Sequence, residues 1–132
     1  METIQLQTTK RTEFIDITSR VTSTISTSGV KEGVVSVFVP HTTAAITINE
    51  NADPSVVRDI LKEINKIIPF NDNYDHIEGN SAAHIKSSLV GCSLHLPVEG
   101  GRPVLGTWQG IYFCEFDGPR TRRVLVQAVP SK

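Results

Sequence analysis

Charge of one sign and long apolar runs are both scarce in this sequence of 132 residues. Thirteen Lys and Arg residues against fourteen Asp and Glu residues leave a formal net charge of −1. This balance argues against a protein that coats nucleic acid, because such proteins carry a basic face. No apolar run approaches the roughly 20 residues that a membrane-spanning helix needs. We therefore expect neither nucleic acid nor a membrane as a partner.

Cysteine is also rare, with only Cys92 and Cys114 in the chain. The first residues contain an acid and no apolar stretch, so the sequence shows no secretory signal or transit peptide, and we expect a cytoplasmic protein. In a reducing compartment two isolated cysteines are expected to stay free rather than form a disulfide.

The patterns that are present predict one domain over residues 1–132, with 39% hydrophobic residues to build its core. Helices are expected from Thr18 or Ser19 to Gly29, from the Asp53-Pro54 cap to Pro69, and from Asn80 or Ser81 through Leu89 to Gly91. Strands, the first two as an antiparallel pair, are expected at 5–7, 13–17, 33–39, 44–48, 93–98, 110–116 and 122–129. The sum is an α+β fold with a mainly antiparallel sheet and helices packed on one face.

The segment from Asp75 to His84 is rich in groups that bind ligands. Helical spacing places His84 on a polar stripe with Asn80, Ser87 and Ser88, and predicts an apolar stripe of Ala82, Ile85 and Leu89. His76 precedes the helix and could converge with His84 on one ligand. The helix start at Asn80 and Ser81 suits a phosphate, because free N–H groups and a partial positive charge gather there. A solvated histidine and an ordinary helix cap explain the same residues.

His41 stands at a corner between two predicted strands and is followed by the hydroxyls of Thr42 and Thr43. Together with His76 and His84 it could form a catalytic zinc centre with an open fourth position, although the spacing matches no established zinc signature. Glu50 or Glu115 could add a ligand or a general base, or could simply be solvated. His95 lies between two leucines of an alternating strand and is left out of the site.

Two further motifs point to recognition of a ligand. Trp108 is the only tryptophan and lies between glycines, so it could offer a flat wall to an aromatic ligand, with Gln109 as the hydrogen-bonding group; a strand entry packed by Trp108 explains it equally. Arg120 and Arg122 follow an acidic turn, and arginine pairs bidentately with phosphate. An ordinary charged turn is the alternative.

Four ordered motifs resemble the YjbQ family over nearly the whole chain. They are Pro40-His41-Thr42-Thr43-Ala44-Ala45 with Asn49-Glu50-Asn51, Asp75-His76 through Gly79-Asn80 with Ala83-His84-Ile85-Lys86, Gly106-Thr107-Trp108-Gln109-Gly110, and Glu115-Phe116-Asp117-Gly118-Pro119-Arg120. Members are small α+β proteins that assemble as trimers and have been credited with a secondary thiamine-phosphate synthase activity.

The resemblance implies a metal-dependent enzyme that acts on a small phosphorylated molecule, with its pocket between the subunits of a homotrimer. It marks His41, His76 and His84 as metal ligands, with zinc favoured by the histidines and magnesium by a diphosphate. It also implies proton transfer by His84 or Glu50. Substrate contacts would come from Thr42, Thr43, Asn80, Ser81, Trp108, Gln109, Arg120 and Arg122. A trimeric module that binds a metal or phosphometabolite without turnover, and a purely structural protein, are the rival hypotheses.

Overall fold

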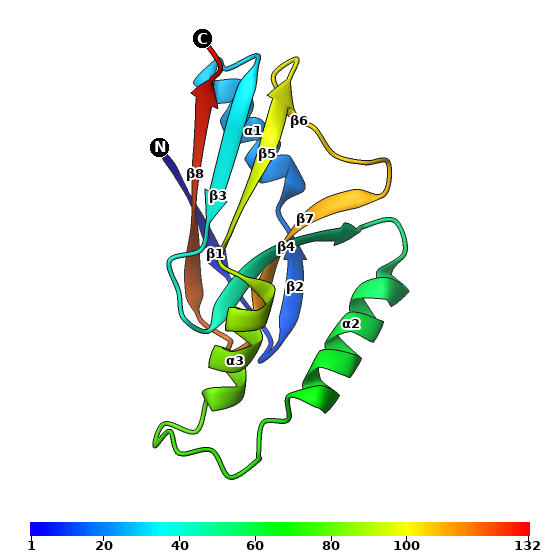
Figure 1. Cartoon of the computed structure of the whole chain (residues 1–132), viewed down its shortest axis with the longest axis vertical. Helices are drawn as coiled ribbons and strands as arrows, with labels where there is room; N and C mark the ends of the chain where they lie inside the picture. The colour runs from blue at the N-terminus through cyan, green and yellow to red at the C-terminus, as the bar shows by residue number, and fades with distance from the viewer.

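The computed structural model describes all 132 residues and contains two antiparallel sheets (Figure 1). The first has the order β1-β8-β3-β5-β6, and the second has the order β2-β7-β4. The strands are β1 (Glu2–Gln7), β2 (Glu13–Asp16), β3 (Gly33–Phe38), β4 (Ala44–Glu50), β5 (Ser93–Glu99), β6 (Arg102–Pro103), β7 (Gln109–Glu115) and β8 (Thr121–Pro130). The helices are α1 (Thr18–Ser28), α2 (Pro54–Ile67) and α3 (Ser81–Val90).

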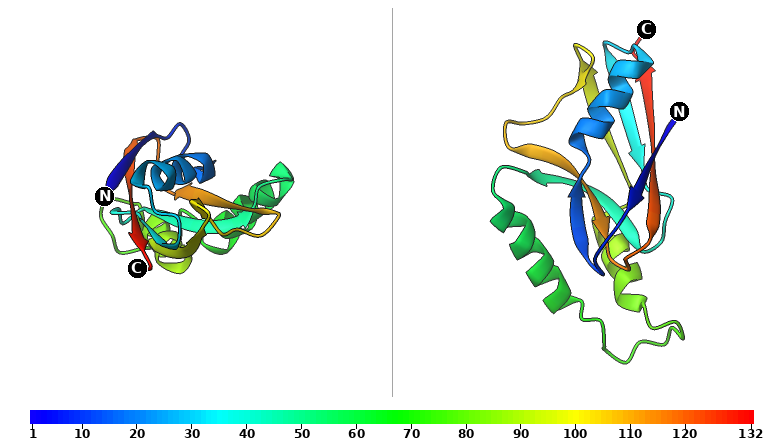
Figure 2. Two further views of the ribbon diagram at one scale, coloured as in Figure 1. Left: turned by 90° about the horizontal axis from the view of Figure 1, so that it is seen from above. Right: turned by 180° about the vertical axis from the view of Figure 1, so that it is seen from behind.

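The predicted α+β class is confirmed, but the expected single sheet is divided in two. β1 and β2, expected to pair with each other, lie in different sheets: β1 pairs with β8 and β2 pairs with β7. The pattern of alternation fixes which side chains are buried, but not which strand is the neighbour. The helices are divided as well, since α1 lies behind the five-stranded sheet whereas α2 and α3 lie beside the three-stranded one (Figures 1 and 2).

The main core lies where α1 and the two sheets meet. Its members include Val21 and Ile25 of α1, Val35 of β3, Ile46 of β4 and Phe113 of β7, all 2% exposed or less. A second, smaller cluster contains Ala45, Ala83, Tyr112, Cys114 and Phe116. Because neighbouring residues of β4 and β7 alternate between these clusters, the three-stranded sheet is buried on both faces.

Helix α2 begins as the sequence predicts. The Asp53 side chain accepts from the Ser55 N–H at 2.9 Å, and Pro54 occupies the first turn. Val57 and Ile64 pack against the smaller cluster, yet no residue of α2 is fully buried, and Ile67 is 64% exposed. None of the three helices is long and apolar enough to cross a membrane.

The apolar stripe predicted for α3 is wrong in part. The buried residues of this helix are Ala82, Ala83, Lys86 and Ser87, whereas Ile85 and Leu89 are 39% and 69% exposed. Small residues let the helix lie close to the sheet, and the two long apolar side chains fall outside that contact. Only packing decides which face of so short a helix is covered, because polar and apolar residues are mixed around it.

Lys86 is wholly buried on this face. Its Nζ atom has no hydrogen-bond partner and lies 3.7 Å from the centre of the Phe70 ring, which also receives the Arg11 guanidinium at 3.6 Å. Burial, followed by the positive charge of Arg11, lowers the pKa of Lys86 to about 8. The contacts of both cations with Phe70 hold the chain just after α2 against α3 and the loop between β1 and β2.

Candidate functional site

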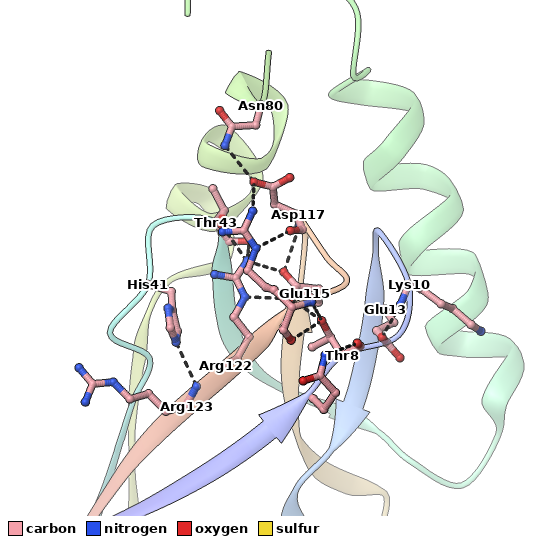
Figure 3. A network of polar contacts seen from close by, with 12 residues as sticks. Thr8, Lys10, Glu13, His41, Thr43, Asn80, Glu115, Asp117, Arg122 and Arg123 are labelled. Carbon is pink, nitrogen blue, oxygen red and sulfur yellow. Dashed lines mark hydrogen bonds and ion pairs between the residues drawn. The ribbon is translucent and has the colours of Figure 1, made fainter. Parts of the chain in front are cut away.

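A buried ion pair anchors the polar end of the three-stranded sheet (Figure 3). Glu115 ends β7 and is 0% exposed, and Arg122 on β8 is 3% exposed. Arg122 donates from Nε to Glu115 Oε1 at 2.8 Å and from Nη2 to Oε2. The Thr8 hydroxyl lies 2.8 Å from Oε1, and the Asp117 N–H donates to Oε2 at 3.0 Å. Each carboxylate oxygen therefore has two polar partners.

These contacts determine the ionisation of Glu115. Burial alone would raise its pKa, but the hydrogen bonds from Arg122, the Asp117 N–H and Thr8 outweigh burial and leave the pKa lowered. The carboxylate is thus held ionised and closely bound, which does not suit the general base or metal ligand considered from the sequence. Its role in this chain is to position β7, β8 and the loop before β2.

Arg122 and Thr43, both predicted to contact substrate, belong to this network. Arg122 Nη2 also donates to the Thr43 carbonyl at 3.2 Å and to its Oγ1 at 2.8 Å. Thr43 is 4% exposed. Arg122 still borders an open cavity of about 470 Å³ together with His41 and Arg120, but its guanidinium is paired with Glu115, so Arg120 is the more accessible arginine of this cavity.

The turn after β7 links this network to α3. Asp117 Oδ2 accepts from Asn80 Nδ2 at 2.9 Å and from Arg120 Nη2 at 3.0 Å. Asn80 therefore ties the start of α3 to the turn and makes no side-chain capping bond. Gly118 is required here, because an added Cβ would lie 2.3 Å from the Lys10 carbonyl oxygen. Arg120, with half of its side chain exposed, remains accessible.

His84 and His76 meet near the start of α3. Their ring centres are 5.4 Å apart and the rings are nearly perpendicular. Both border a cavity of about 360 Å³, together with Tyr74, Asp75 and Ser81. The expected convergence of His76 and His84 is thus present, and Ser81 lies beside them.

His41 and His84 border a second cavity. The two residues line a cavity of about 320 Å³ with Thr42, Ser87 and Cys92. His41 Nε2 accepts a hydrogen bond from the Arg123 N–H at 3.1 Å (Figure 3). Burial, and then the positive charge of Arg122, lower the pKa of His41. His84 therefore stands between two cavities, one shared with His76 and one with His41.

The three histidines do not form a complete metal centre within one chain. No group of three or more His, Cys, Asp or Glu side chains is placed to hold an ion. His41 Nε2 is already engaged by a backbone N–H, which leaves His76 and His84 as the histidines that face each other; His76 Nε2 also lies 4.0 Å from Glu78 Oε2.

The end of the three-stranded sheet that lies away from Glu115 carries Glu50, Gln109 and the preceding Trp108. Glu50 pairs with Gln109, whereas Ala44 pairs with Glu115, so six residues of β4 separate the two ends. At roughly 3.3 Å per residue this separation is about 20 Å. Gln109 Oε1 accepts from the Gly106 N–H at 2.7 Å and so holds its own loop, while Trp108 is 63% exposed. None of them lines the cavities bordered by the histidines.

Sequence reasoning missed Asp75, Tyr74, Ser87 and Cys92 as cavity-lining residues. Asp75 and Tyr74 are close to His76 in the sequence, which was the available signal. Ser87 was placed on the same stripe as His84, but its burial follows from how α3 packs. No local pattern brings Cys92 beside His41. His95 is exposed on β5, as expected, and lines none of these cavities.

Comparison with known proteins agrees with this fold. A family model described as UPF0047 protein YjbQ-like matches residues 2–131. The chain is 57% identical over 128 residues to UPF0047 protein MJ1081 of Methanocaldococcus jannaschii, covering 97% of this chain and 93% of that protein. It is 54% identical over 128 residues to UPF0047 protein YugU of Bacillus subtilis, covering 96% and 97%.

Solved structures give the same result. A crystal structure of a YjbQ/UPF0047 family protein from Clostridium acetobutylicum has a TM-score of 0.96 at 53% identity and covers 98% of this chain and 100% of that one. A YbjQ-like protein from Sulfolobus solfataricus gives 0.94 at 34% identity, covering 98% and 96%. Similarity in both sequence and structure along almost the full length shows that this chain belongs to the YjbQ/UPF0047 family.

Proposed function

We propose that this protein is an enzyme that acts on phosphorylated small molecules at a site centred on His84. The observation that carries the proposal is the position of His84 between two polar cavities, one shared with His76 and one with His41. The neighbouring cavity adds Arg120 and Arg122. Imidazoles that can transfer a proton next to arginines that attract phosphate are the groups that phosphate-ester and diphosphate chemistry requires.

We further propose that the site is completed between copies of this chain, in a homotrimer. Glu50 lies at the opposite end of β4 from Ala44, about 20 Å away at roughly 3.3 Å per residue, and Trp108 precedes Gln109, the residue that pairs with Glu50. A neighbouring copy could bring its Glu50 and Trp108 to the histidine end. The exposed Ile85 and Leu89 beside His84, and the exposed Ile67 on α2, supply apolar surface for such a contact.

A metal ion is proposed only for the assembled protein, not for the single chain. His76 and His84 are the side chains that would hold an ion, and a further ligand would come from Asp75 or from a neighbouring copy. Imidazoles favour zinc, whereas a carboxylate with a diphosphate favours magnesium. Such an ion would supply positive charge to a departing phosphate group.

Thiamine-phosphate synthesis is the reaction that we propose to test first. A thiazole phosphate nitrogen forms a bond to the exocyclic carbon of an aminopyrimidine diphosphate, the carbon–oxygen bond to the diphosphate breaks, and pyrophosphate leaves with the bonding electrons. The accessible Arg120 would offset the charge of the leaving group. Trp108 of a neighbouring copy would stack on a heterocycle.

A binding module without turnover is the second candidate, and one observation favours it. Neither carboxylate considered as a general base is available within one chain. Glu50 lies at the far end of β4, and Glu115 is bound to Arg122. Proton transfer would then depend on His84 alone.

The test incubates the purified protein with an aminopyrimidine diphosphate and a thiazole phosphate, with zinc or magnesium, and measures thiamine phosphate, pyrophosphate and binding of each compound. We expect turnover by the wild-type protein, a loss of at least ~100-fold in His84→Ala, and no change in His95→Ala, which alters an exposed histidine outside the cavities. Binding without product would favour the module. No binding of either compound would overturn the proposal. Light scattering measures the oligomeric mass, and a mass equal to one chain would overturn the proposed trimer.

A further inference from the structure

His76 lies in the connection between α2 and α3, at the end of the molecule away from the C-terminus (Figure 1). Residues 71–79 of this connection are exposed, apart from the half-buried Tyr74. Their two hydrogen bonds are local: Tyr74 Oη donates to the Pro69 carbonyl at 2.6 Å, and the Gly79 N–H donates to the His76 carbonyl at 3.2 Å. No hydrogen bond or ion pair joins residues 71–79 to a more distant part of the chain. The position of His76 therefore depends on how the two ends of the connection are held.

Phe70 holds the first end. Its ring centre lies 3.6 Å from the guanidinium carbon of Arg11 and 3.7 Å from Lys86 Nζ. Two cations this close to one ring centre would collide and repel each other on the same face, so the ring lies between them. Each face of an aromatic ring attracts a cation. The clamp, defined as Phe70 between Arg11 and Lys86, thus joins the connection to the loop before β2 and to α3.

The environment of Lys86 makes the clamp firm. Lys86 is wholly buried, and its Nζ atom has no hydrogen-bond partner. The face of the Phe70 ring is the attractive contact that the structure gives this ammonium group. If the ring moved away, the buried charge would lose that contact as well, and an unpaired buried charge is costly. Phe70 is therefore held by more than the burial of its own ring.

Asn80 holds the second end, because its Nδ2 atom donates to Asp117 Oδ2 at 2.9 Å. The same end leads directly into α3, which carries both Lys86 and His84. The clamp therefore fixes the connection against the helix on which His84 lies. Between the two ends, the His76 ring meets the His84 ring nearly at a right angle, with the ring centres 5.4 Å apart. This spacing depends on where the clamp places the connection.

We propose that Phe70 is a positioning residue for the histidine pair. The clamp fixes the connection so that His76 lies beside His84. Phe70 itself lines neither of the cavities that His84 borders. Its consequence for turnover rests on the proposed function, whereas its effect on the distance between the two rings does not.

The first test measures the nuclear Overhauser effect between the ring protons of His76 and His84 by NMR on the purified protein, with signals assigned by His76→Ala and His84→Ala. We expect the effect in the wild type and in Phe70→Tyr, which keeps an aromatic ring for the two cations. We expect it to be lost in Phe70→Leu, which keeps apolar bulk without an aromatic face. Its absence in the wild type or in Phe70→Tyr, or its persistence in Phe70→Leu, would overturn the proposal.

Two further variants separate positioning from general stability. Phe14→Leu removes a ring that packs against the smaller core cluster, with its centre 5.8 Å from that of Tyr112, and should destabilise the protein but keep the effect. Arg11→Gln removes one cation at an exposed position, so the fold should survive even where Phe70→Leu unfolds, and the effect should weaken. Loss of the effect in Phe14→Leu, or an unchanged effect in Arg11→Gln, would contradict the clamp.

Turnover separates this inference from the proposed function. A catalytic group displaced by ~1 Å loses about 100-fold in rate, so Phe70→Leu should lower thiamine-phosphate formation by about that factor, while Phe14→Leu should not. No turnover by the wild type, with the ring-to-ring effect intact, refutes only the proposed function. Turnover by the wild type, with an unchanged effect in Phe70→Leu, refutes only this inference. Full turnover in a variant that has lost the effect would remove Phe70 from the reaction.

Discussion

The Glu115–Arg122 network and the histidine cavities lie side by side, yet they differ in how completely their polar atoms are hydrogen-bonded. In the network every oxygen of the Glu115 carboxylate is bound, by Arg122, Thr8 and the Asp117 N–H. In the cavities, the rings of His76 and His84 border open space, and the one charged contact of either ring is that of His76 with Glu78 at 4.0 Å. The first arrangement fixes the chain, and the second leaves groups free to bind.

The difference shows why charge alone is a poor guide to a site. Arg122 and Glu115 have the residue types of a phosphate clamp and a general base, but their mutual contact uses those capacities internally. His41 accepts the Arg123 N–H, whereas the rings of His76 and His84 form no hydrogen bond within the chain and keep theirs. The predictions below separate the two regions by their effect on stability.

The largest effect is expected from breaking the network. Replacing Glu115 with alanine leaves the Arg122 charge buried without a partner, and should cost about 3–5 kcal/mol of unfolding free energy, measured by urea denaturation. The pH dependence follows from the lowered pKa of Glu115: its contribution is complete above the usual carboxyl pKa of 4.5 and is lost as the pH falls through the lower value of the folded state.

Two comparisons control this prediction. Glu13→Ala removes a carboxylate whose contacts are exposed, and should cost less than ~1 kcal/mol. A double variant, Glu115→Leu with Arg122→Met, removes both charges and should be more stable than either single alanine variant. Equal stability of Glu115→Ala and the wild type would show that the pair does not anchor the sheet ends.

A smaller effect, of opposite sign, is expected at Lys86. Its buried amine lacks a partner, so Lys86→Met should stabilise the protein at pH 7. The folded pKa of about 8 lies below the ordinary 10.5, which at about 1.4 kcal/mol per pKa unit limits the gain to ~3 kcal/mol. Because the wild type gains stability as the pH rises from about 8 toward 10.5, the advantage of the variant should shrink over that range.

Urea denaturation at pH 7 and pH 10 measures this advantage. Lys62→Met, at an exposed position of α2, should show neither the gain nor its pH dependence. A lower stability of Lys86→Met at pH 7 would mean that the contact of Lys86 with Phe70 outweighs the cost of burial.

The smallest effect on stability is expected at the histidine cavities. His76→Ala and His84→Ala should each change the unfolding free energy by less than ~0.5 kcal/mol, because neither ring belongs to a core cluster. Thermal unfolding at pH 7 provides the measurement. A loss above ~2 kcal/mol in His84→Ala would place His84 in the same structural class as Glu115 and remove the contrast between the two regions.

Much of the secondary structure could be predicted from local sequence. The Asp53-Pro54 cap and the apolar repeat after it define α2, and alternation defines the strands. The pairing of the strands could not be predicted, because β1 and β2 find their partners more than 90 residues along the chain. The buried face of α3 was wrong for a related reason: the sheet accepts small residues, and this preference outweighs the hydrophobicity of Ile85 and Leu89.

The sequence by itself determined the α+β class, the family and the histidines that deserve testing, since these depend on short patterns and ordered motifs. Only the tertiary structure decided which polar groups are already satisfied. It paired Arg122 with Glu115, gave His41 the Arg123 N–H, and left Ser87 without a partner. The physical reason is that hydrogen bonds are satisfied between segments distant in sequence, and a residue's chemistry is free only when packing leaves its donors and acceptors unused.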